Sequence, residues 1–273
     1  MTTSSRNDDS TEADDDLAAP VDDEVDGELE SDGEADDDPE SLDEPPPPSF
    51  PAPRLVHALG VAAFMTFAVG VAFSSGMAFG RAAFGLLAVA FGGAAVFGVL
   101  RSRAEGRAQT LRLRSGDLTL SAFTAAFLYA LVLGGHPLLF PRGQPRELFF
   151  LLAYVPLVDP LSDGRHVVAV AAGIVCALEE LALRSLVQPV FARKIGDLGA
   201  WIATIVLDAI VWAPTLLLLG DPRAGWNPVF VGFAAAVALV TGYLRLRTDR
   251  VAPSVLCRML LGWALIEFPV WAP

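Results

Sequence analysis

The stretch HVVAVAAGIVCALEELALRSLVQPVF occupies residues 166–191 and is largely apolar, yet it contains Glu179, Glu180 and Arg184. Its length matches a membrane-spanning helix, which needs about 20 mostly apolar residues. A charged side chain at the centre of such a helix costs about 2.5–3.5 kcal/mol on insertion scales. Residues this costly are usually paired inside a helix bundle and are usually functional. The stretch therefore predicts a membrane helix with one polar, protein-facing side.

Further apolar runs extend from residue 55 to the C-terminus. The chain is 53% hydrophobic and its mean hydropathy is +0.48, above the average of a soluble domain. We predict an all-α, polytopic transmembrane helix bundle of about seven spans. The predicted spans are 55–74, 78–100, 118–138, 166–190, 199–219, 228–244 and 251–271.

Residues 148–158, LFFLLAYVPLV, are too few for a straight crossing. If they do not cross, three basic loops share the side of the N-terminus, as the positive-inside rule favours; an eighth crossing would separate them. These loops are 101–114, 192–197 and 245–250. We therefore predict seven spans in the cell membrane and a cytoplasmic N-terminal tail. The loop 140–147, with Arg142 and Arg146, would then face outward, against the rule.

The N-terminal part has a different composition. Residues 1–44 hold 20 of the 32 acidic residues and one basic residue, Arg6. Such a segment lacks the apolar groups that offset the entropy of ordering, so we expect disorder, followed by a stiff proline-rich spacer over 43–53. The chain thus divides into a tail, 1–54, and a transmembrane domain, 55–273.

Single residue types add two hints. Lys194 is the only lysine, which together with the acidic tail is typical of salt-adapted archaeal proteins. Cys176 and Cys257 lie in apolar segments without a Cys/His cluster, and we interpret them as small buried residues.

Five charged residues fall well inside predicted spans, away from the span ends: Glu179, Glu180, Arg184, Asp208 and Arg258. Glu180 and Arg184 are four residues apart, so they share a helix face in the favourable order. Glu179 points about 100° away from Glu180. The five residues predict either a catalytic site with one free carboxylate or an ion-pair network that only stabilises the bundle.

Two motifs resemble those of a known family. EELALR (179–184) matches the EExxxR signature of the CPBP intramembrane proteases, also called the Abi or CAAX protease family. GYLRLRTDRVAPSVLCRMLLGW (242–263) resembles the passage between the last two core helices of that family. The resemblance spans about 160–270. It implies a helical bundle in which Glu179 or Glu180 activates a water for peptide hydrolysis, while Arg184 orients or neutralises its neighbour.

The chain departs from the family pattern at two motifs. The FxxxH motif should fall within 207–216, which contains no histidine, and the HxxxN motif reads as Arg258 and Gly262. The three histidines lie at predicted span ends or in loops: His57, His136 and His166. The residues therefore predict no metal site and no cofactor. Loss of oxyanion donors typically costs a factor of about 10²–10³ each.

We therefore expect a CPBP-type endopeptidase-like membrane protein of reduced or lost activity, with Asp208 and Arg258 as replacement helpers of the acid pair. The alternative is a non-catalytic scaffold that binds a membrane partner. A proton- or ion-coupled carrier is a third hypothesis, based only on the buried acids. Expected partners are membrane lipid and a membrane peptide or protein substrate, with no nucleic acid; the oligomeric state stays open.

Overall fold

The structure, a computed structural model, describes residues 55–74, 81–154 and 164–270. The predicted acidic tail, 1–54, lies outside these residues. The described part is helical and contains no β-strand, so the all-α prediction is confirmed. Its elements are α1 (Leu55–Ala72), α2 (Arg81–Ala104), η1 (Arg107–Leu111), α3 (Asp117–Leu139), α4 (Glu147–Tyr154), α5 (Arg165–Ala182), η2 (Leu183–Val187), α6 (Gln188–Trp212), α7 (Pro214–Leu218), α8 (Val229–Thr248) and α9 (Ala252–Glu267).

Five helical stretches of the described residues are long and apolar enough to cross a membrane, so this is a membrane protein. They are Leu55–Ala72, Ala82–Ala104, Asp117–Leu139, Arg165–Leu218 and Val229–Thr248. The fourth stretch, 54 residues long, contains both the fourth and the fifth predicted spans. α9 has 16 residues. The number of crossings stays a prediction.

The turn predicted at 192–197 is shorter than expected. Helical structure continues on both sides of Gly196, whose φ of 73° and ψ of 172° break the helix at that residue. Glycine adopts a positive φ without the steric cost that a Cβ imposes. The prediction of a loop over 192–197 is therefore wrong, because these residues are helical and only Gly196 leaves the helical conformation.

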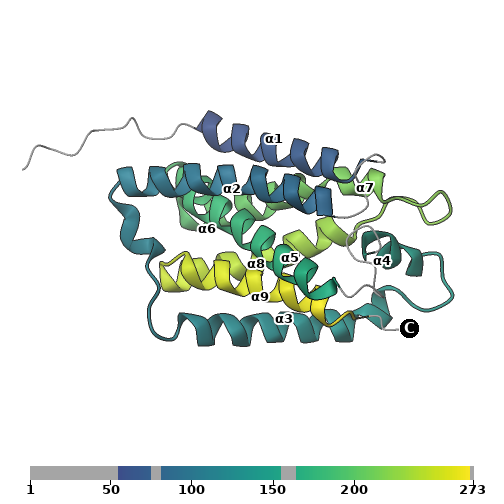
Figure 1. Cartoon of the computed structure of the whole chain (residues 1–273). Coiled ribbons are helices and arrows are strands. Elements are labelled where there is room, and N and C mark those ends of the chain that lie inside the picture. Colours follow the sequence, from purple (N-terminus) through teal and green to yellow (C-terminus); the bar gives the residue numbers. More distant parts are fainter. Residues whose placement is uncertain (1–54, 75–80, 155–163, 271–273) are drawn as a thin grey trace, which may run out of the picture. The chain divides into compact units, whose positions relative to one another are not determined.

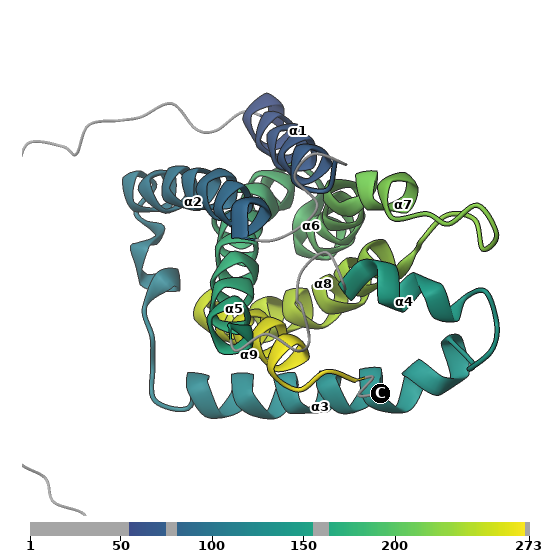
Figure 2. The same ribbon diagram turned by 45° about the vertical axis from the view of Figure 1, so that its right-hand side comes forward.

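The bundle is built around α5, which packs against α9 and α2, whereas α6 packs against α8 and α1. α3 reaches the bundle through α9, and Figures 1 and 2 show it running alongside that helix. The outer surface is apolar: Phe67, Val89 and Phe123 are 69%, 76% and 74% exposed. Within the bundle, the charged side chains of Glu179, Glu180 and Arg184 are completely buried, as expected where lipid surrounds the helices.

The three basic loops meet at one end of the bundle. Glu105, in the first loop, forms ion pairs with Arg107 and with Arg193 of the second. The backbone N–H of Val251, just after the third, donates to Thr110 O at 2.8 Å. Seven crossings require these loops to share a side, as they do here.

The apolar run 148–158 forms only part of a short helix. α4 has eight residues, far fewer than a crossing needs, and residues 155–158 lie outside the described part. Asn227 holds α4 by donating from Nδ2 to Phe149 O at 2.8 Å and to Leu219 O at 3.1 Å. α4 thereby lies beside the start of α8.

Candidate functional site

The helix that carries the acid pair changes its winding directly after it. α5 ends at Ala182, and the π-helical turn η2 follows over Leu183–Val187. Such turns are rare and occur frequently at functional sites. The turn includes Arg184, whose side chain is completely buried.

Arg184 is held by four groups. Nε donates to Glu180 Oε1 at 2.6 Å, and Nη2 donates to Ala238 O and to Thr241 Oγ1, each at 3.0 Å. Nη1 lies 3.4 Å from Gln188 Oε1. The guanidinium therefore ties η2 to α8 as well as to Glu180.

Arg258, on α9, joins the three acids. Its Nη1 donates to Glu180 Oε2 at 2.9 Å and to Asp208 Oδ2 at 2.6 Å, while Nη2 donates to Asp208 Oδ1 at 3.2 Å. Nη2 also lies 2.9 Å from Glu179 Oε2. One guanidinium thus links α5, α6 and α9.

Glu179 has one further partner that the sequence did not suggest. Trp212 Nε1 donates to Glu179 Oε1 at 2.5 Å. The other oxygen, Oε2, is buried and accepts no hydrogen bond from the described residues, although it faces Arg258. Of the cluster's carboxylate oxygens, this one has no hydrogen-bond donor in the described part of the chain.

The structure therefore brings all five predicted residues into one buried group, which we name the acid–arginine cluster: Glu179, Glu180, Arg184, Asp208 and Arg258. Four of them are 0% exposed and Arg258 is 3% exposed. Sequence reasoning missed Trp212, Gln188 and Thr241. Gln188 follows Arg184 by one helical turn and could have been suspected on that spacing. Nothing in the sequence pointed to Trp212 or Thr241.

The histidines lie elsewhere. His57 is in the first turn of α1 and His136 in the last turn of α3. His166, at the start of α5, contacts Glu267 with Nδ1 2.7 Å from Oε1. No group of three or more His, Cys, Asp or Glu within the described ranges has the geometry of a metal site.

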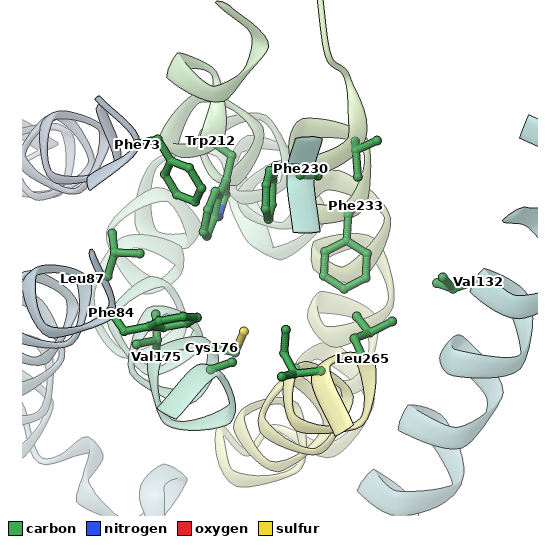
Figure 3. A pocket seen from close by; sticks show the side chains of 15 residues that line it. Phe73, Phe84, Leu87, Val132, Val175, Cys176, Trp212, Phe230, Phe233 and Leu265 are labelled. Atoms are coloured by element: carbon green, nitrogen blue, oxygen red, sulfur yellow. The ribbon is translucent and has the colours of Figure 1, made fainter. Parts of the chain in front are cut away.

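An apolar cavity of about 130 Å³ adjoins the cluster, and we name it the inner cavity. Figure 3 shows aromatic and aliphatic side chains pointing into it, among them Phe73, Phe84, Trp212, Phe230, Phe233 and Leu265. Cys176, Trp212 and Gly262 also line it. On α5, Cys176 lies four residues before Glu180. On α6, Trp212 lies four residues after Asp208, and on α9, Gly262 lies four residues after Arg258. The cavity is therefore about one helical turn from the cluster on all three helices.

The position of the expected motif asparagine has no room for a side chain. A Cβ at Gly262 would lie 2.7 Å from Cys176 Sγ and 3.1 Å from Cys176 Cβ. Cys176 occupies the space that a longer side chain at 262 would need. Gly262 and Cys176 therefore pack directly against each other, which leaves no space for an asparagine at 262.

Comparison with known families agrees with the motifs. Residues 163–264 match the family model described as type II CAAX prenyl endopeptidase Rce1-like. Comparisons with curated proteins and with solved structures give no match. The matched segment contains the whole acid–arginine cluster and the helices that line most of the inner cavity. Over residues 163–264, then, this membrane protein is similar to the Rce1-like CAAX prenyl endopeptidases of the CPBP family, as the EELALR motif predicted.

Proposed function

We propose that this chain is a CPBP-type intramembrane endopeptidase-like protein whose hydrolytic activity is reduced to background. The acid–arginine cluster stabilises the bundle and does not activate water. The remaining role is to bind a membrane peptide or protein within the helical core. The observation that supports this proposal is the position of Arg258, which contacts all three acids of the cluster.

A general base needs a free lone pair within about 2.6–3.2 Å of the water it deprotonates. Both oxygens of Glu180 already accept from guanidinium groups, one from Arg184 and one from Arg258. A guanidinium keeps its protons in proteins, so Arg258 cannot replace a histidine as an acid–base group. The arginine therefore holds the carboxylates as ion-pair partners.

The inner cavity offers little help to hydrolysis. Its lining consists of apolar and aromatic side chains, glycine and Cys176. The indole N–H of Trp212 already donates its hydrogen bond to Glu179. A developing oxyanion there would need preorganised donors. Such a cavity suits an apolar side chain or lipid tail better than a tetrahedral intermediate.

One observation favours the second candidate, a divergent but active endopeptidase. Glu179 Oε2 accepts no hydrogen bond from the described residues. In that candidate, Oε2 takes a proton from a water whose oxygen attacks the peptide carbonyl, and Arg258 stabilises the oxyanion. Glu179 then gives the proton to the leaving amine as the C–N bond breaks.

Peptide hydrolysis separates the two candidates. We expect purified protein in proteoliposomes to cleave a library of quenched membrane peptides no faster than its Glu179→Gln variant, within about twofold. The variant should fold, because glutamine keeps an acceptor for Trp212. It also leaves two acids opposite two guanidiniums, so the buried cluster becomes neutral.

The exposed-acid variant Asp197→Asn serves as the matched control. A rate that falls about 10²-fold or more in Glu179→Gln, and not in Asp197→Asn, would establish the active candidate. Equal background rates in all three proteins support the non-catalytic one. Circular dichroism and thermal unfolding of each variant show that folded proteins are compared.

A further inference from the structure

A second, larger apolar space lies between α3 and α8, and we name it the α3–α8 groove. Its volume is about 670 Å³. One wall is formed by α3, including Leu131 and Gly135, and the other by α8, including Gly232 and Ala236; Leu261 of α9 also lines it. Figure 2 shows α3 and α8 on either side of α9. Most of this lining is apolar, so the groove is suited to a hydrocarbon chain.

Polar side chains line the groove at one end only. His136 lies in the last turn of α3, Arg146 immediately precedes α4, and Trp226 lies in the loop before α8. This end is opposite the three basic loops, because α3 starts beside them and α8 ends beside them. Tryptophan is enriched at the membrane–water interface, where lipid headgroups lie. The arrangement places a cation at headgroup level and apolar walls at chain level.

The two loops beside the polar end of the groove, 140–147 and 219–228, carry three arginines and two acids. The arginines are Arg142, Arg146 and Arg223, and the acids are Glu147 and Asp221. Glu147 accepts from the backbone N–H of Gly143 at 2.7 Å, and Asp221 accepts from that of Arg223 at 2.7 Å. Within the described residues, none of the three arginines forms an ion pair. Both acids thus accept hydrogen bonds within their own loops. Glu147 and Arg142 also lie close enough to His136 to interact with it electrostatically, and Arg146 is left available to an external anion.

We propose that the α3–α8 groove binds one anionic phospholipid of the surrounding membrane. Its phosphate lies at Arg146 and His136, its glycerol region beside Trp226, and an acyl or alkyl chain between α3 and α8. Basic pockets between transmembrane helices are known to bind lipid headgroups, and a guanidinium matches phosphate geometry. The proposal is independent of whether the acid–arginine cluster is catalytic.

The proposal accounts for the loop that opposes the positive-inside rule. On the predicted topology, the loop 140–147 faces outward with two arginines. Topology gives no reason for them on that side. Recognition of an anionic headgroup explains an arginine on that side, because Arg146 lies at the polar end of the groove.

The amount of lipid that the purified protein retains tests this proposal directly. The detergent-purified protein is mixed with equimolar phosphatidylglycerol and phosphatidylcholine of identical chains, and native mass spectrometry counts the bound adducts. We expect one phosphatidylglycerol per protein, preferred by about fivefold or more. The Arg146→Gln variant should lose about fivefold in this preference, the factor expected for one arginine near an anionic lipid. Arg247→Gln, an exposed arginine at the opposite end of the bundle, is the matched control.

A substitution that fills the apolar part of the groove tests whether a lipid chain binds there, and it changes no charged residue. A Cβ at Gly232 would meet no atom within 4 Å, so Gly232→Leu occupies the groove without a clash in α8. Leucine also favours helix over glycine. We expect this variant to fold and to lose the retained lipid. Gly134→Leu, on α3 outside the groove lining and equally open, should retain it.

Four results would overturn the proposal. Equal retention of phosphatidylglycerol and phosphatidylcholine would show that the site does not recognise the charge of the headgroup. Equal effects of Arg146→Gln and Arg247→Gln would show that only general surface charge matters. Wild-type retention of lipid by Gly232→Leu would show that the groove does not hold the lipid. Competition by millimolar inorganic phosphate would instead indicate a free-phosphate site. Thermal unfolding in the same detergent verifies the fold of each variant.

Discussion

Replacing Arg258 by methionine should destabilise the folded bundle by about 3–5 kcal/mol, the cost of breaking a buried ion pair by removing one partner. Arg258 is 3% exposed and contacts Glu179, Glu180 and Asp208. Without it, three buried carboxylates share the single guanidinium of Arg184, which directly pairs with Glu180. Methionine fills a similar volume, so the loss reports charge and hydrogen bonding more than packing.

Unfolding of the detergent-solubilised protein by a denaturing detergent, followed by circular dichroism, measures this effect. Arg247→Met is the matched control, because Arg247 is exposed on α8 and should change stability by less than about 0.5 kcal/mol. The double variant Arg258→Met with Asp208→Leu should recover part of the loss, since one carboxylate goes with its cation. Equal stabilities of Arg258→Met and Arg247→Met would show that the cluster does not hold the bundle together.

The Gly173→Leu variant should lose about 3 kcal/mol, at the upper end of the usual cost of overpacking. A Cβ at Gly173 would lie 3.0 Å from the backbone oxygen of Met259 and 3.3 Å from Trp263 Cβ. These atoms belong to the backbone or lie next to it, so no side-chain rotation relieves the contact. α9 must move away from α5, and Arg258, one residue before Met259, moves with it.

The same unfolding assay applies, with Gly85→Leu on α2 as control because a Cβ there meets nothing within 4 Å. Gly173→Ala should cost less than Gly173→Leu, since only the Cβ contact is added. If Gly173→Leu and Gly85→Leu unfold alike, α5 and α9 do not approach each other as closely as described.

Much of the candidate site could be predicted because placing a charged side chain inside a membrane is unfavourable in free energy. That cost alone indicated that Glu179, Glu180, Arg184, Asp208 and Arg258 are buried together. The pairing of Glu180 with Arg184 followed from their spacing, since residues four apart share a helix face.

Contacts between distant segments could not be predicted in this way. Trp212 and Glu179 are 33 residues apart, and Arg184 and Thr241 are 57 apart. Such pairs depend on how helices cross and rotate against one another, which one sequence does not encode locally. The break at Gly196 was placed in the right turn but given too many residues, because loop composition does not reveal how sharply a chain turns.

By itself, the sequence determined that this is a helical membrane protein with an apolar exterior, a charged interior and the EELALR motif. Those properties follow from the lipid environment and from helix periodicity, which act on neighbouring residues. Only the tertiary structure decided that Arg258 stands between all three acids, that Cys176 occupies the space beside Gly262, and that α3 and α8 leave an apolar groove. The reason is physical: these arrangements depend on side-chain volumes and donor directions from helices that meet only after the chain has folded.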